Sequence, residues 1–163
     1  MSTCYLNGEF LPLKDAKVSV MDRAFMFGDA VYEVIPVKHG KIFTAEEHIA
    51  RLEGSLSAIE LENPYRAPEW NALLEKILVA NEKNQRSIYV QVTRGAAERD
   101  HVLQTDVRPT VLIMSQTGPE YRDLTRVNAI TSQDIRWKRC DIKSTSLLAN
   151  VLLRNQAKAA NAY

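Results

Sequence analysis

Residues 87–93, S-I-Y-V-Q-V-T, carry the clearest strand pattern in this chain. Its apolar residues Ile88, Val90 and Val92 alternate with more polar ones. Because successive side chains of a strand point to opposite faces, this alternation predicts a strand with one face in the core. Such a strand needs a second layer to cover its apolar face, so helices are expected elsewhere in the chain.

Further strand signals lie before and after this stretch. An Asn-Gly pair at 7–8, between two short apolar runs, predicts a tight hairpin turn. A His-Gly pair at 39–40 divides a second hairpin spanning residues 31–43 in the same way. Residues 110–114 form a continuous apolar run, which predicts a strand covered on both faces.

Two amphipathic helices are predicted between these strands. Thr44 and Glu47 have the T-x-x-E spacing of a capping box, and apolar residues then recur at helical spacing to about residue 60. Pro68 fits the first turn of the next helix, where its missing N–H costs nothing. We therefore expect an α+β fold, with a two-layer domain of mixed or antiparallel sheet and two helices over residues 1–118.

The rest of the chain predicts a second unit. Residues 119–125 are a polar connector, residues 127–131 resume as a strand, and a helix is expected from Leu147 almost to Tyr163. One strand, one loop and one helix are too few to close a core. We expect residues 126–163 to be the incomplete beginning of a second domain.

Composition argues against several classes of function. Lys and Arg number 21 against 20 Asp and Glu, so no excess charge favours nucleic acid or an anionic membrane. No apolar stretch reaches membrane-spanning length. Cys4 and Cys140 lie far apart, and the chain has three His, so we expect neither a metal site nor a disulfide. Two cysteines without a disulfide pattern favour a reducing compartment, and we expect a cytoplasmic protein.

The first candidate for chemistry is Lys143, in R-W-K-R-C-D-I-K-S-T-S at 136–146. It follows a short apolar step and precedes three hydroxyl residues and the last predicted helix. An amine placed at such a junction, if it is desolvated or near other cations, loses its proton more readily and attacks carbonyl carbon. The alternative is a solvated surface lysine, which is the commoner position for this residue type.

Four more residues are candidates for binding. Arg51 lies at the border of the apolar face of its predicted helix. Its guanidinium can hold a phosphate there, or the aliphatic part of its side chain can simply cover the apolar face. Arg99 and His101 follow a strand and can converge on a small anion such as a carboxylate, although loops are commonly polar. Tyr32 faces away from its strand neighbours, either into a pocket or as an ordinary core or edge tyrosine.

Four collinear segments together resemble the fold-type IV pyridoxal-phosphate aminotransferases. The R-x-H at 99–101 and the W-x-R-C-D-I-K-S stretch most resemble the D-amino-acid aminotransferase branch. The resemblance extends over almost the whole chain. The segments are D-R-A-F-M-F-G-D-A-V-Y-E-V (22–34), F-T-A-E-E-H-I-A-R-L (43–52), Y-V-Q-V-T-R-G (89–95) and I-R-W-K-R-C-D-I-K-S (135–144).

The resemblance implies a role for each candidate. Lys143 matches the lysine that holds pyridoxal 5'-phosphate covalently and later carries a proton between the substrate and the cofactor. Arg51 matches the arginine that holds the cofactor phosphate. Tyr32, Arg99 and His101 match the trap for the substrate carboxylate, the last two from the neighbouring subunit of a homodimer. The implied reaction is transamination between a D-amino acid and a 2-oxo acid.

The resemblance also leaves alternatives. Family members continue well past Tyr163, where the acidic partner of the cofactor ring and part of the phosphate cup would lie. The 163-residue chain is therefore expected to bind cofactor weakly and to turn over substrate slowly or not at all. A branched-chain aminotransferase and an aminodeoxychorismate lyase share the scaffold and the lysine, but Arg99 and His101 argue against both. A non-catalytic fragment that dimerises is the alternative outside the enzymes.

Overall fold

Six antiparallel strands form one sheet in the order β2-β1-β6-β5-β3-β4, with four α-helices in the described part of the chain. The computed structural model describes residues 2–81, 84–118 and 127–162, and it has the predicted α+β fold. The strands are β1 (Thr3–Leu6), β2 (Glu9–Pro12), β3 (Ala30–Lys38), β4 (Lys41–Ile42), β5 (Gln85–Thr93) and β6 (Thr110–Thr117). The helices are the 3-10 turn η1 (Leu13–Asp15), α1 (Arg23–Phe27), α2 (Ala45–Ala58), α3 (Ala67–Ala80) and α4 (Leu148–Ala159).

Strand β5 lies in the middle of the sheet, as its alternation predicts. It pairs with β3 on one side and β6 on the other, and its residues Ile88, Val90 and Val92 are buried. Both predicted hairpins are present, with positive φ at the Asn-Gly and His-Gly turns. The turn residues therefore set the register of the two outer strand pairs.

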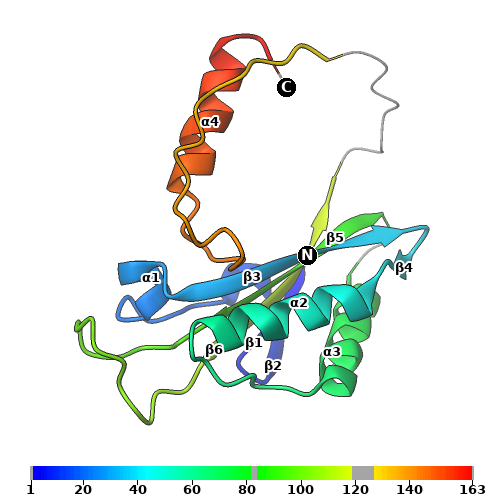
Figure 1. Ribbon diagram of the computed structural model, residues 1–163. Helices are drawn as coiled ribbons and strands as arrows, with labels where there is room; N and C mark the ends of the chain where they lie inside the picture. The colour runs from blue at the N-terminus through cyan, green and yellow to red at the C-terminus, as the bar shows by residue number, and fades with distance from the viewer. Residues whose placement is uncertain (1, 82–83, 119–126, 163) are drawn as a thin grey trace.

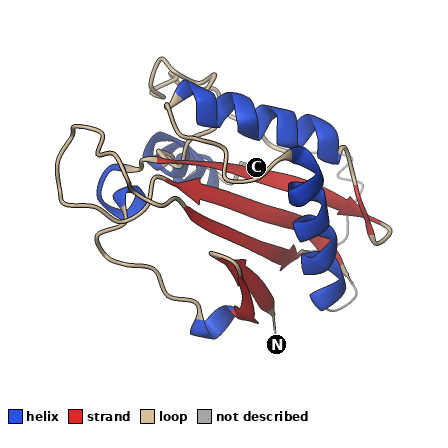
Figure 2. Cartoon of the chain, turned by 90° about the horizontal axis from the view of Figure 1, so that it is seen from below, coloured by secondary structure: helices blue, strands red, loops and turns tan. Residues whose placement is uncertain are grey.

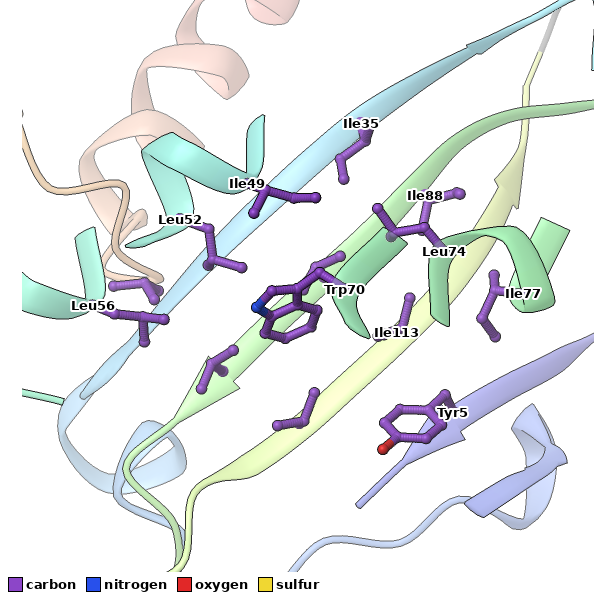
Figure 3. Packing of buried hydrophobic residues seen from close by; sticks show 14 of the residues in the cluster. Tyr5, Ile35, Ile49, Leu52, Leu56, Trp70, Leu74, Ile77, Ile88 and Ile113 are labelled. Carbon is purple, nitrogen blue, oxygen red and sulfur yellow. The ribbon is translucent and has the colours of Figure 1, made fainter. Parts of the chain in front are cut away.

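Helices α2 and α3 cover the same face of the sheet (Figure 2). Their apolar stripes meet the inward side chains of β3, β5 and β6 in one core, shown in Figure 3. Trp70 of α3 lies at its centre, and its indole N–H donates to the Asn63 side chain at 3.0 Å. The opposite face of the sheet carries no described long helix packed along it.

The expectation that β6 is covered on both faces was wrong. Val111 and Ile113 are buried against the helices, but Leu112 and Met114 are only half-buried on the open face. The continuous apolar run was misleading because both faces of a strand can be apolar while only one is packed.

Two local predictions near the first helices were also wrong. Helix α2 begins after Thr44, but Thr44 adopts a left-handed conformation (φ 53°) and its side chain makes no capping hydrogen bond. The aromatic-rich stretch D-R-A-F-M-F-G-D at 22–29 predicts a loop from sequence, yet it contains α1. Asp22 caps this helix by accepting from the Ala24 N–H at 2.9 Å, and Gly28 ends it with φ 68°.

Residues 127–131 form no strand, contrary to the prediction. They are exposed and pair with no strand among the described residues, and a strand without a ladder partner leaves its backbone groups to water. The expected connector at 119–125 lies outside the described residues. Helix α4 ends at Ala159, buries none of its residues and stands away from α2 and α3 (Figure 1). No helix in the described part is long and apolar enough to cross a membrane.

The core makes a direct prediction. Trp70→Ala is expected to lower the free energy of unfolding by about 3–5 kcal/mol, because it empties the centre of the core. Val79→Ala, on the exposed side of the same helix, is the control and should change it by less than about 0.5 kcal/mol. Urea unfolding followed by circular dichroism measures both, and equal effects would contradict this account of the core.

Candidate active site

The backbone around Lys143 lies along the edge of β3. The Tyr32 N–H donates to the Lys143 carbonyl at 3.0 Å, and the Thr145 N–H donates to the Ala30 carbonyl at 3.1 Å. This edge is open because β4 pairs only with the last residues of β3. The segment therefore extends the sheet at a point where β3 has unpaired backbone groups.

Helix α2 holds the same segment from the other side. The Lys143 N–H donates to the Ser55 hydroxyl at 3.3 Å, and Ser55 is buried. Arg51 lies four residues earlier on α2, hence on the same face and about 6 Å along the helix axis. The fold thus brings Lys143 and Arg51 to one end of β3.

The Lys143 side chain lines a cavity of about 850 Å³ together with Tyr32. Its amine nitrogen lies 3.9 Å from the centre of the Tyr32 ring, an attractive contact for a cation. A cavity of this volume suits a small organic ligand. No carboxylate lines it among the described residues. The other lining residues include Phe25, Phe27, Gly28, Trp137, Cys140, Ser144, Thr145, Ser146 and the first residues of α4.

Tyr32 is supported from behind by Tyr89. The two rings stack with centres 5.7 Å apart. Burial, and to a lesser degree the neighbouring Tyr32, raises the pKa of the Tyr89 hydroxyl, which donates to the Gln91 side chain at 2.7 Å. This neutral platform keeps the Tyr32 ring on the open face of the sheet, away from the core.

Arg51 is held by a buried acid. Both oxygens of Glu33 accept from it, Nε and Nη2 each at 2.6 Å, and this pairing raises the pKa of the guanidinium. Glu33 also accepts from His48 Nδ1 at 2.8 Å. The Glu33 side chain is 1% exposed and that of Arg51 53% exposed. Because Glu33 occupies one edge of the fork, the outer edge of Arg51 still points to solvent, although Arg51 does not itself line the cavity.

Arg99 and His101 lie together, but not beside Lys143 of the same chain. Both are exposed and both contact Phe27: the Arg99 guanidinium is 5.3 Å from the ring centre and the His101 ring 5.2 Å. Phe27 lines the Lys143 cavity, whereas Arg99 and His101 do not. The predicted site residues therefore form two groups in one chain, one around Lys143 and one around Phe27.

Sequence reasoning missed two acids, the buried Glu33 and the partly buried Asp29. Glu33 follows the same alternation as Val31 and Ile35, which places its carboxylate on the core face, where a charge needs a partner. That alternation was the available signal. Asp29 accepts from Arg23 Nε and Arg94 Nε, each at 2.8 Å. Its partners come from separate segments, so no local spacing indicates the cluster.

Comparison with solved structures shows that this fold is found in aminotransferases of known structure. The branched-chain amino acid aminotransferase of Escherichia coli matches with a TM-score of 0.83 at 22% identity, over 98% of this chain and 57% of that one. The PLP-bound form of a hypothetical aminotransferase from Mycobacterium tuberculosis matches with a TM-score of 0.77 at 22% identity, over 98% and 59%. At these identities the likeness establishes the fold alone.

Sequence comparison identifies the family. The profile of amino-transferase class IV matches residues 30–163, and the chain belongs to that family. The family is pyridoxal-phosphate-dependent. The D-alanine aminotransferase of Staphylococcus haemolyticus is 41% identical over 165 residues, which cover 99% of this chain. The chain spans 58% of the length of that relative.

The buried pair in the site makes a second prediction. Glu33→Gln is expected to lower the free energy of unfolding by about 1–3 kcal/mol, because an amide cannot accept both guanidinium hydrogen bonds in a buried position. The half-exposed Arg51 regains water, which limits the loss. Glu53→Gln, on the exposed side of α2, is the matched control. Urea unfolding of both variants checks this, and an unchanged stability of E33Q would show that the pair does not support the fold.

Proposed function

We propose that this chain is the lysine-bearing part of a pyridoxal-phosphate-dependent enzyme that transfers an amino group between a D-amino acid and a 2-oxo acid. The observation that carries the proposal is the Lys143 amine, which lines a cavity while its backbone is fixed to β3 and α2. The 41% identity to a D-alanine aminotransferase supports the D-amino acid as substrate.

The residues present fit the cofactor. Lys143 supplies an amine at the cavity wall, Tyr32 an aromatic face beside it, and Arg51 the outer edge of a guanidinium for the phosphate. When bound, the cofactor supplies an electron-withdrawing ring that stabilises negative charge on the α-carbon of the substrate. The role of this chain is therefore to hold the cofactor, to orient the substrate and to transfer protons.

Lys143 has the geometry for two tasks in turn. With the cofactor bound, the Lys143 amine would hold it covalently. When free, the same amine would accept the α-proton of the substrate and donate it again. Its backbone is held by Tyr32 and Ser55, so only the side chain moves between these positions. A short movement of this kind keeps the amine near the reacting carbon throughout.

Arg51 and Glu33 would act as one unit on the cofactor phosphate. Glu33 fixes the plane of the guanidinium through two hydrogen bonds, and His48 holds Glu33 in turn. Because the guanidinium is planar, fixing its inner edge also fixes the direction of its outer edge. Because Arg51 has already lost much of its side-chain freedom, binding a phosphate there costs less conformational entropy.

We assign the substrate carboxylate to Tyr32, Arg99 and His101. The last two lie around Phe27 and outside the Lys143 cavity of their own chain, which supports their supply from the neighbouring subunit of a homodimer. They also favour a D-amino-acid enzyme over a branched-chain aminotransferase or an aminodeoxychorismate lyase. A non-catalytic dimerising fragment would not need the Lys143 amine in a cavity.

Labelling of the lysine tests the proposal. The chain is incubated with pyridoxal phosphate, reduced with borohydride and mapped by peptide mass. We expect partial labelling at Lys143 and slow turnover in the 163-residue chain, because no carboxylate in its described cavity can partner the cofactor ring. Lys143→Ala should lose the label and any yellow colour, whereas the exposed control Lys138→Ala should keep both.

Two results of this experiment would count against us. Equal labelling of K143A and the unsubstituted chain would remove Lys143 from the chemistry. Full stoichiometric labelling with rapid transamination would instead show that the 163 residues need no further acid.

Substrate choice is tested separately, with the gene product as the cell makes it. D-alanine with a 2-oxo acid should be turned over at least about tenfold faster than L-leucine, because the carboxylate trap sets which face of the α-carbon meets the lysine. Aminodeoxychorismate should not be cleaved. Faster turnover of L-leucine, or release of pyruvate from aminodeoxychorismate, would favour one of the two alternative enzymes.

A further inference from the structure

Arg23 is a buried arginine that lies outside the Lys143 cavity and connects two parts of the chain. Its side chain is 4% exposed. Its Nε donates to Asp29 at 2.8 Å, and its Nη1 donates to the backbone carbonyl of Asp100. Asp100 lies between the two residues assigned to the substrate carboxylate, Arg99 and His101.

The hydrogen bond to Asp100 is important because the loop around it has few other attachments. Among the hydrogen bonds of the described residues, it alone joins the loop of residues 98–109 to another segment. The other bonds of this stretch are local, such as Asp100 N–H to the Glu98 carbonyl and Val102 N–H to the Asp100 side chain. The position of the loop therefore depends strongly on Arg23.

Phe27 gives the loop a second contact at the same place. The Arg23 guanidinium lies 4.9 Å from its ring centre, and Arg99 and His101 lie 5.3 and 5.2 Å from it. A phenyl face attracts cations but fixes their direction only weakly. The directional part of the contact is the hydrogen bond from Arg23 to the Asp100 carbonyl.

Arg23 is itself held to the rigid part of the fold. Asp29, its partner, also accepts from Arg94 Nε at 2.8 Å. Arg94 in turn donates to the carbonyls of Ile59 and Glu60 at the end of α2. The Asp29 backbone is fixed independently of the Arg94 side chain, because the Arg94 N–H donates to the Asp29 carbonyl at 3.2 Å. Arg23 therefore keeps its anchored partner when only the side chain at position 94 is changed.

We propose that Arg23 is a positioning residue for the substrate carboxylate. By holding the Asp100 carbonyl it sets where Arg99 and His101 lie, and so where they meet a carboxylate. This inference rests on the proposed function, which assigns the carboxylate to these two residues. Arginine suits the task because one planar group donates to Asp29 and to Asp100 in fixed directions, which a lysine ammonium does not reproduce.

A variant of Arg23 and a matched control separate this role from a general effect on stability. Arg23→Lys keeps a cation beside Asp29 but loses the second arm to Asp100. Arg94→Lys disturbs the same Asp29 oxygen at a similar depth without touching the loop, and is the matched control. Arg23→Gln, which buries no charge, is the second variant if R23K does not fold.

The structural measurement is the NMR signal of the His101 ring, one of three histidines in the chain. In R23K or R23Q the His101 signal should move toward that of a free imidazole, because the ring leaves Phe27, while His39 and His48 stay unchanged. R94K should leave His101 in place. An unshifted His101 in the Arg23 variants would overturn the proposal.

The functional measurement uses the gene product as the cell makes it. In R23K the KM for D-alanine and the inhibition constant of propionate, a carboxylate without an amine, should each rise about tenfold, equivalent to a loss of 1.4 kcal/mol. The kcat should change much less, and cofactor labelling at Lys143 should not change. R94K should leave both constants near their original values.

The possible outcomes distinguish the proposal for Arg23 from the proposed function on which it rests. A shifted His101 with unchanged KM and propionate inhibition would show that Arg23 holds the loop but that the loop does not bind carboxylate, which overturns the proposal. Absence of Lys143 labelling in the unsubstituted protein would overturn the proposed function instead. The NMR result would then still decide whether Arg23 holds the loop.

Discussion

The site depends on one interaction, the docking of residues 143–145 on the open edge of β3. Two backbone hydrogen bonds, from Tyr32 to Lys143 and from Thr145 to Ala30, give this segment the place of a further strand. Backbone bonds fix direction better than side-chain contacts, and they hold regardless of which side chain follows. The side-chain amine of Lys143 can therefore move while the backbone of this residue is fixed to the sheet.

The edge of the sheet is also the one place where groups from both faces meet. Glu33 and Arg51 lie on the helix side, whereas Tyr32 points to the open side, because neighbours on a strand alternate. Lys143 joins the strand between them. A residue in the middle of the sheet would reach only one of these two sides, so the open edge of β3 is a requirement of the site.

The alternation of residues 87–93, the two hairpin turns and the α2 and α3 stripes were enough to predict the α+β fold, because each is a local pattern. The errors came where tertiary context decides. Residues 127–131 have strand-forming side chains but no described partner, and the apolar run in β6 is packed on only one face. Helix α1 carried readable signals, an Asp cap and a terminal Gly, that were overlooked.

The candidate site divides in the same way. Lys143, Arg51 and Tyr32 were predicted from sequence, and the structure brings them to one end of β3. The buried Glu33 and the partly buried Asp29 were not predicted, because the partners of an acid become evident only when distant segments meet. Glu33 lies beneath Arg51 and fixes it in place, whereas Asp29 holds Arg23 and Arg94 together. The candidate binding residues were thus predictable by type, while the acids that orient their neighbours required the fold.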